Sequence, residues 1–552
     1  MLRLITSSRF IYPAVISCAA VAVIVASVVQ GTYNLDPHHW GLMLSNAVDF
    51  DRGRVPYKDI FIQYGFLTTL LEYVFFITGK NLASIIAGVA LCYALGLVGI
   101  YVLTLHFTRR RPVALYAFLT AVLVHPLAIY PWSNYVAFPF MTFGCLAVVK
   151  GREDVRAGFL GGVLFGLAVL AREGLFLALA PALMALVPLQ RWCSPDLTYV
   201  VRRLVPVAGF FLTLMLFFLY LWFHDLTGYW WSTAIGLPKL YAAIFFKDGM
   251  FAAVRALLAY IFQFSLRTHI RQTVFALIVM SAAGCWLWAL VKRPKAAAQA
   301  DMLFVALTTG LLMSAALHLN EIFRLATSIT VGMGLVFIIA DRVRMAGFLF
   351  VLLALGLVAG AFGNDNGDYF LPDRAQIKAT TRDERIGLFA GQRWSQDVFD
   401  YYNWYVDAVT LLQTRNCGLR YFRNETRDAF LEALTPFVQY QLMPVGVGMH
   451  EVPLDTWTHK LRPDYDLDER LKSRDILVAT VRQPATAEER AVADGHRVFN
   501  PFIPPQPAPQ EVSPPAGYEI FAFRATPKSW FLHDGLVTVL LAPASCGALP
   551  QM

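Results

Sequence analysis

The chain has 552 residues, of which 57% are hydrophobic and only 15% are charged, and its formal net charge is +8. Soluble globular domains carry roughly a quarter charged residues, so this composition excludes an ordinary soluble protein. Repeated long apolar runs instead predict a polytopic α-helical membrane protein, because lipid satisfies no backbone hydrogen bonds. The basic residues form short clusters between apolar runs, not a surface with interleaved aromatics, so nucleic acid is excluded as a partner.

Hydropathy predicts about 11 transmembrane helices. The expected spans are 10–30, 82–107, 113–130, 135–149, 157–171, 174–189, 204–223, 272–291, 302–318, 325–340 and 346–362. The basic clusters between them, such as Arg109 to Arg111, all fall on one side of this topology. By the positive-inside rule that side is cytoplasmic, which places the N-terminus inside and residues 1–362 in the cytoplasmic membrane.

Two outward loops, 31–81 and 224–271, are too long to be simple connectors. In the first, residues 66–77 are apolar but shorter than a span, which predicts an interfacial helix. In the second, a group of aromatic residues is followed by an amphipathic stretch, 251–266. These features are typical of a protein that manages a lipid head group, although aromatic side chains also serve simply as interfacial anchors.

The composition changes in the C-terminal region, 363–552, where long apolar runs stop and charge and proline rise. Its length suffices for a core of its own, and we expect a soluble, extracytoplasmic α+β domain. The expected elements are a helix at 382–413 and strands at 475–479, 518–523 and 536–541. Cys417 and Cys546 are its only cysteines and could form a disulfide outside the cell. Nothing in this domain looks catalytic, so acceptor recognition and structural support both stay open.

A short polar cluster, Asp36-Pro37-His38-His39-Trp40, directly follows the first predicted span. A carboxylate at the membrane surface can act as general base toward a hydroxyl, although Asp36 could also merely cap the helix that follows. His38 and His39 could contact a substrate, or bind a divalent cation together with Asp36. Adjacent histidines on a helix point to different faces, so a metal site would need an irregular turn, which Pro37 permits.

A second polar island in the first outward loop contains Tyr57, Lys58, Asp59 and Tyr64. Asp59 is interpreted as a second acid or as the ion-pair partner of Lys58. Plain surface charge is an equally good interpretation of this island.

Arg172 and Glu173 interrupt the apolar run 157–187. An ion pair at membrane depth is expensive, so the run is better interpreted as two helices with Arg172 near the outer surface. The planar guanidinium suits phosphate, and the alternative is a local salt bridge with Glu173.

Two further outward turns carry polar residues. The turn from His318 to Arg324 is interpreted either as an ordinary helical hairpin or as a functional turn, the latter because it places a cation outside, against the topological bias. Trp132-Ser133-Asn134 forms another short turn that could line the same mouth.

These residues resemble the GT-C glycosyltransferases. The resemblance covers roughly residues 10–362 and rests on an acidic residue after the first span, a long first outer loop with interfacial helices, and roughly a dozen spans. The strings that look like bacterial members acting on surface polysaccharide or lipid are Asp36-Pro37-His38-His39-Trp40-Gly41, Pro56-Tyr57-Lys58-Asp59-Ile60 and Tyr64-Gly65. Many relatives have two adjacent acids where this chain has Asp36-Pro37, so a second acidic role falls to Asp59 or to none.

The resemblance implies a polyprenyl-phosphate sugar as donor and an envelope lipid, polysaccharide or protein as acceptor, at the outer face of the cytoplasmic membrane. Asp36 would take the acceptor's proton in a single displacement with inversion. The residues expected at the donor phosphate are Arg172, Arg324, His318 and Lys58. Those expected to contact the substrates are His38, His39, Tyr57, Tyr64 and Asn134. No cofactor is certain, and a divalent cation is left open.

Two other functions fit the same hydropathy. A flippase or transporter for a lipid-linked sugar would share the basic residues at the outer ends of the spans. Transporters, however, show internal repeats and polar residues at mid-span. The polar clusters of this chain lie at the outer ends of the spans instead. A scaffold in envelope assembly would use the C-terminal domain as its binding module and would not need Asp36.

Overall fold

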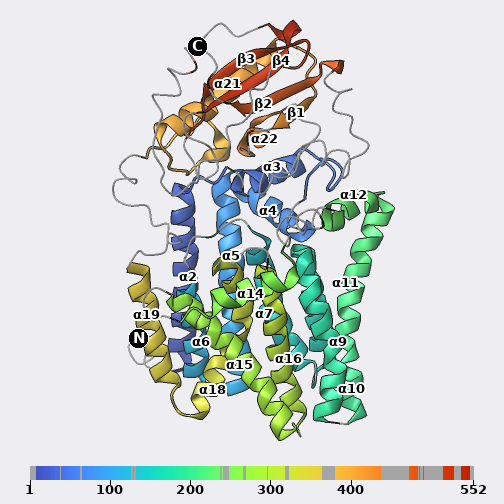
Figure 1. The fold of residues 1–552 in the computed structure, drawn as a ribbon, viewed down its shortest axis with the longest axis vertical. Coiled ribbons are helices and arrows are strands. Elements are labelled where there is room, and N and C mark those ends of the chain that lie inside the picture. The colour runs from blue at the N-terminus through green and yellow to red at the C-terminus, as the bar shows by residue number, and fades with distance from the viewer. Residues whose placement is uncertain are drawn as a thin grey trace.

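Figure 1 shows a long bundle of helices that carries a smaller α/β unit at one end. The structure is a computed structural model. It describes residues 8–37, 39–62, 65–125, 129, 132–194, 196–236, 239, 248–264, 269–294, 296–317, 322–362, 380–424, 426, 428–436, 472–482, 484, 489, 514–527 and 536–547. The α/β unit rests on the bundle through two short helices, α22 (Phe430–Leu434) and α3 (His39–Asp51), which pack against each other.

Every predicted span overlaps at least one helix. The main helices of the bundle are α2 (Ser8–Tyr33), α5 (Leu82–Thr108), α6 (Arg111–Val124), α7 (Ser133–Lys150), α8 (Val155–Ala171), α9 (Phe176–Cys193), α11 (Leu204–Phe223), α15 (Ile270–Lys292), α16 (Ala297–Leu311), α18 (Met333–Arg342) and α19 (Ala346–Phe362). Within the described residues, 6 helical segments are long and apolar enough to cross a membrane by length and composition. The multi-pass helical architecture is therefore confirmed, whereas the count of eleven is not.

Two predicted spans differ from the observed helices for local reasons. Helix α6 ends at Val124 because His125 turns to an extended conformation, as expected for the residue before a proline. The segment predicted at 325–340 is broken into α17 (Ile322–Ala326), a 3₁₀ turn and α18. At this break the Ser328 hydroxyl donates to the Arg324 carbonyl at 2.6 Å, a local bond that competes with regular helix.

Both outward loops contain the short helices that the sequence predicts. Residues 66–77 fall within α4 (Phe66–Gly79), and the amphipathic stretch 251–266 overlaps α14 (Met250–Ile261). Helix α12 (Thr227–Trp231) and a π-helical turn (Ser232–Gly236) follow α11. Helix α4 packs against α3, α5 and α8, so the first loop covers one end of the bundle.

The C-terminal region is a four-stranded sheet with helices on it, which confirms the α+β prediction. The strands are β1 (Tyr421–Asn424), β2 (Ile476–Arg482), β3 (Tyr518–Ala525) and β4 (Val537–Pro543), in the order β1-β2-β4-β3. Strands β1 and β2 are parallel and the other pairs are antiparallel. The sequence predicts three of these strands and misses β1. The long helix, α21 (Gln396–Thr414), begins later than predicted because Thr381 pairs with Trp394 as a short bridge.

The two cysteines of this region lie next to each other as free thiols. Burial, with Cys417 beside it, raises the pKa of Cys546 to about 12. Proximity is the requirement that the disulfide prediction makes, so that pairing stays a prediction for an oxidising compartment. The separation of residues 363–552 as an extracytoplasmic domain stays a prediction as well.

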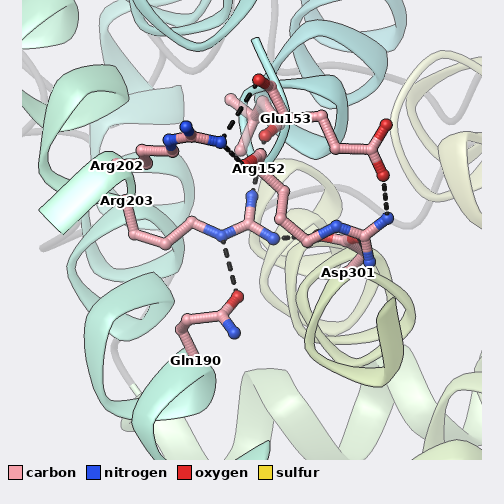
Figure 2. Close-up of polar contacts among 7 residues, drawn as sticks. Arg152, Glu153, Gln190, Arg202, Arg203 and Asp301 are labelled. Carbon is pink, nitrogen blue, oxygen red and sulfur yellow. Dashed lines mark hydrogen bonds and ion pairs between the residues drawn. The ribbon is translucent and has the colours of Figure 1, made fainter. Parts of the chain in front are cut away.

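A buried network of polar side chains ties four helices together at the end of the bundle away from the sheet (Figure 2). Arg203 is fully buried at the start of α11 and forms an ion pair with Asp301 of α16. It also donates to the Gln190 side chain at 3.1 Å and to the Val148 carbonyl at 2.9 Å. Arg152, in the turn between α7 and α8, approaches the other Asp301 oxygen at 3.0 Å. One carboxylate therefore holds two arginines.

Candidate functional site

Asp36 lies between α2 and α3, where it both caps α3 and pairs with His39. Its Oδ1 accepts the backbone N–H of His39 at 2.8 Å, and its Oδ2 lies 3.0 Å from His39 Nδ1. Asp36 is only 2% exposed. An ionised carboxylate can only accept, so Nδ1 of His39 is the donor in such a pair. Both carboxylate oxygens of Asp36 therefore contact His39, because the same Nδ1 also lies 3.3 Å from Oδ1.

An aromatic ring connects this pair to a buried arginine. The His39 ring meets Trp132 edge-on with ring centroids 4.8 Å apart. The guanidinium carbon of Arg324 lies 4.6 Å from the centroid of the same Trp132 ring and 5.3 Å from that of Phe323. A guanidinium is stabilised on an aromatic face. The structure thus brings together Asp36, His39 and Arg324, which belong to outer turns far apart in the sequence.

Asn134 lies beside this cluster in the first turn of α7. It is buried, and its Oδ1 has no hydrogen-bond partner among the described residues. Leaving a buried acceptor unsatisfied costs about 1–3 kcal/mol, so a residue of this kind invites a functional explanation. Its neighbour Tyr135 contacts His125, whose Nε2 lies 2.8 Å from the Tyr135 hydroxyl.

A second buried arginine, Arg271, stands at the start of α15. It lies within electrostatic reach of His125, and α15 packs against α17, the helix that carries Arg324. The sequence alone does not distinguish Arg271, because one arginine at the end of a long loop resembles an ordinary boundary charge. Its burial (3% exposed) is the feature that separates it from such a charge.

Arg172 ends α8 at the same end of the bundle. Its Nη2 donates to the Ala315 carbonyl at 3.1 Å. The neighbouring Glu173 accepts a hydrogen bond from the Tyr57 hydroxyl at 3.3 Å. Tyr57 is buried with a positive φ of 64°, which most residues avoid, so this contact fixes the first outer loop in an unusual conformation. The Glu173 carboxylate is thus engaged by Tyr57, a contact that sequence reasoning missed.

Asp59 and Lys58 lie on a separate turn. The Asp59 carboxylate accepts the Val55 N–H at 2.9 Å and so closes its own turn, while Lys58 is exposed. Among the described residues, no hydrogen bond or ion pair joins Asp59 to Asp36. A role for Asp59 as second acid therefore stays a prediction without a contact to support it.

The same loop buries another carboxylate, Asp49, near the end of α3. Its Oδ1 lies 2.9 Å from Arg54 Nη1 and 3.7 Å from Arg52 Nη1. Burial raises the pKa of Asp49 to about 6, although Arg54 and Arg52 act in the opposite direction. Desolvation outweighs two nearby cations here.

Three predicted site residues, His38, Tyr64 and His318, lie outside the described residues. The structure therefore does not test a metal site formed by both histidines with Asp36. Within the described part of the chain, no group of three or more His, Cys, Asp or Glu side chains is arranged to hold a metal ion.

The arrangement suits chemistry on an anionic substrate. A carboxylate with a histidine partner can accept a proton from a hydroxyl. Arg324 lies next to it and Arg271 and Arg172 stand at neighbouring helix ends, which are positions for stabilising negative charge that develops on a leaving group. Asp36 is buried in this conformation, so a hydroxyl reaches it only when neighbouring segments move aside.

Comparison with known proteins identifies the fold. The structure is similar to that of ArnT from Cupriavidus metallidurans bound to undecaprenyl phosphate, with a TM-score of 0.51, 12% sequence identity, and coverage of 98% of this chain and 99% of that one. It also matches an apo structure of the same ArnT (TM-score 0.41, 14% identity, 99% of this chain and 100% of that one). An oligosaccharyltransferase from Archaeoglobus fulgidus matches with a TM-score of 0.44 and 13% identity, over 86% of this chain and 70% of that one.

No protein-family profile matches the chain. No curated protein matches it by sequence either. The likeness to ArnT extends over almost the whole of both chains, so the chain shares the fold of that protein.

Proposed function

We propose that this protein is a membrane glycosyltransferase that moves a sugar from a polyprenyl-phosphate donor to a hydroxyl of an envelope acceptor. The observation that carries the proposal is the cluster in which Asp36, His39 and Arg324 meet around Trp132. It combines a proton acceptor and a phosphate-binding cation at one end of a bundle of membrane helices. The ArnT structure with undecaprenyl phosphate supports a donor of this class.

The reaction follows from these positions. Asp36 takes the proton of the acceptor hydroxyl while that oxygen forms a bond to the anomeric carbon of the donor sugar. The bond from the anomeric carbon to the phosphate oxygen breaks, and the polyprenyl phosphate leaves with the electron pair. One carboxylate suffices for this single displacement, which inverts the anomeric configuration. His39 holds the carboxylate in place during the transfer.

The leaving phosphate gains negative charge, and we assign its stabilisation to Arg324 and Arg172, together with Arg271. Arg324 is held on the Trp132 face, so its guanidinium is in place before the reaction starts. Asn134 is the amide that we assign to a sugar hydroxyl. Its unsatisfied buried oxygen supports that assignment.

The expected orientation follows from the two ends of the bundle. Helix α18, which ends at Arg342 and whose Asp341 pairs with Arg110, lies at the end opposite the sheet (Figure 1), and we propose that this end faces the cytoplasm by the positive-inside rule. Transfer then takes place on the outer face of the cytoplasmic membrane, beneath the C-terminal domain.

Sugar transfer in proteoliposomes tests the proposal. Purified protein is given a panel of radiolabelled polyprenyl-phosphate sugars with a membrane-lipid extract as acceptor. We expect one donor to label the acceptor, and Asp36→Asn to reduce the rate by at least ~10²-fold without reducing folded protein. Movement of labelled donor across the bilayer by both proteins, with no transfer, would instead identify a flippase and leave Asp36 a helix cap.

A further inference from the structure

The C-terminal region covers the helix that follows Asp36. All residues of α3 from His39 to Asp49 are buried, although this helix contains several polar side chains. Helix α22 of the C-terminal region packs directly on α3. Figure 1 shows both helices at the junction between the bundle and the sheet. The segment that carries Asp36 is therefore an internal layer between the two parts of the molecule.

Hydrogen bonds from the C-terminal region to backbone carbonyls join it to the chain on both sides of Asp36. On the N-terminal side, the Arg393 N–H donates to the Thr32 carbonyl at 2.7 Å, and the Trp394 indole donates to the Asn34 carbonyl at 3.3 Å. On the C-terminal side, the Ala429 N–H donates to the Pro37 carbonyl at 2.9 Å. The chain is thus held within two residues of Asp36 in each direction.

The contact at α3 is close enough to involve the backbone itself. A Cβ atom added to Gly41 would lie 2.8 Å from the Phe430 backbone nitrogen and 3.0 Å from the Ala429 carbonyl carbon. Cβ atoms essentially never approach backbone so closely, so only glycine allows this packing. Gly41 and Ala429 are small residues, and their size allows the α3 and α22 segments to pack in close contact.

The turn that carries Ala429 is rigid in its own right. Asp428 is fully buried, its Oδ1 accepts the Phe430 N–H at 3.0 Å, and its Oδ2 accepts the Tyr402 hydroxyl at 3.0 Å. The Asn424 side chain donates to the Asp428 carbonyl at 2.7 Å. A network of buried, satisfied polar groups fixes one conformation strongly. The Ala429 N–H therefore reaches Pro37 from a fixed support.

From these contacts we propose that the C-terminal region is a clamp that positions Asp36, with Ala429 and Trp394 as its positioning residues. The proposal rests on the proposed function and adds a task for a domain that supplies no reacting group. A general base must be held within about 0.5 Å of its working position. Asp36 sits in a short link between two helices, so its position depends on what holds that link.

The test uses the full-length protein and removes one clamp contact at a time. Ala429 has a φ of −72°, which proline adopts. Ala429→Pro therefore removes the N–H donor to Pro37 at an allowed φ, and its ring Cδ, in the place of that hydrogen, pushes the Pro37 carbonyl away. Ala429→Gly keeps that N–H and is the matched control. Arg52→Gln is the second control, because it breaks a different contact to this region, from Arg52 Nη1 to the Thr435 carbonyl (3.0 Å).

Two measurements are made on each variant: steady-state sugar transfer, and hydrogen–deuterium exchange of backbone amides in residues 36–42. For Ala429→Pro we expect kcat to fall ~10- to 100-fold with an unchanged KM for the donor, because the donor site is intact and only the base is displaced. We expect exchange in residues 36–42 to accelerate at least ~10-fold. Ala429→Gly and Arg52→Gln should keep the kcat of the unsubstituted protein.

Each outcome decides the proposal. Unchanged exchange in Ala429→Pro would overturn the clamp, and faster exchange with unchanged kcat would overturn its positioning role. If Ala429→Pro fails to fold, Trp394→Phe removes the indole donor to Asn34, together with part of a buried ring that packs on Phe430, and should show the same two changes at smaller size. If the unsubstituted protein transfers no sugar, the proposed function fails, and the exchange data alone decide whether the clamp exists.

Discussion

Two aspartates, one at each end of the helical bundle, are equally buried and have opposite surroundings. Asp301 lies between the guanidinium groups of Arg203 and Arg152. Asp36 is 2% exposed as well, but its partners are an imidazole and a backbone amide, both from His39. A carboxylate between two arginines serves as their counter-charge, whereas we expect the carboxylate that His39 positions to act as a general base. The two aspartates therefore differ in their partners and not in their burial, and on this difference we base the different tasks that we propose for them.

The greatest change that we expect is a loss of stability when Asp301 is replaced. Asp301→Asn leaves the buried Arg203 and the partly buried Arg152 without their shared counter-charge, and removing one partner of a buried ion pair costs ~3–5 kcal/mol. We expect a large fall in the thermal unfolding temperature in detergent, with normal transfer per folded molecule.

Glu153→Gln is the matched control for that variant. Glu153 pairs with Arg152 but its side chain is 74% exposed, so its loss should cost no more than ~1 kcal/mol. An equal loss of stability in the two variants would show that burial of the network does not matter.

The next prediction concerns the stabilisation of negative charge by Arg324, at the end of the bundle that carries Asp36. Arg324→Gln removes the cation beside the Asp36–His39 pair, and we expect kcat to fall by ~10²- to 10³-fold with little change in stability. Arg324→Lys should recover part of the rate, because it restores the charge on Trp132 without the planar fork. Arg385→Gln, which breaks an exposed ion pair with Asp407, is the control. A normal rate in Arg324→Gln would remove this residue from the mechanism.

The pH dependence of stability tests the buried turn at Asp428, which holds the Ala429 N–H against Pro37 beside Asp36. Burial raises the pKa of Asp428 to about 7 from 3.8, so the folded protein binds this proton more tightly than the unfolded chain does. Its contribution to stability is complete at pH values below the unfolded pKa and is lost as the pH rises to about 7. Between about pH 5 and about pH 7 the loss is about 2 kcal/mol.

Thermal melts across this range measure the effect. Asp428→Asn should reduce the fall in stability with rising pH. Some dependence should remain in that variant, because burial also raises the pKa of Glu432. A pH dependence identical to that of the unsubstituted protein would contradict the assignment to Asp428.

The smallest expected effect concerns the first outer loop. Tyr57→Phe deletes the hydroxyl that donates to Glu173, which should cost about 1–2 kcal/mol of stability and only a few-fold in transfer. Tyr73→Phe is the control, because the Tyr73 ring stacks on Phe50 and keeps that contact without its hydroxyl. Equal melting temperatures for the two variants would show that the Tyr57 contact is not a stabilising one.

The helical bundle is predictable because each long apolar run lies within one continuous segment of the sequence. Long apolar runs define α2, α5 and α15, since a hydrophobic span needs no partner to be recognised. The broken segment around α17 is not predictable in this way, because its apolar residues continue through the break. The strand β1 has only four residues, so its pattern is too short to stand out.

The candidate site is predictable only in part. The position of Asp36 after the first span identifies it as a candidate, and its pairing with His39 is a contact between near neighbours in the chain. The meeting of Trp132 with Arg324 depends on tertiary packing, which one sequence does not display. The contact between Gly41 and Ala429 leaves no chemical trace in the sequence, because neither residue has a polar side chain.

The central claim is that the two buried aspartates have different tasks, and one paired measurement tests it. Asp36→Asn and Asp301→Asn, the same change at both ends, are compared for thermal unfolding and for sugar transfer per folded molecule in proteoliposomes. We expect Asp36→Asn to unfold near the normal temperature and to lose transfer by at least ~10²-fold, and Asp301→Asn to unfold at a lower temperature and to transfer normally. Normal transfer by folded Asp36→Asn would contradict it.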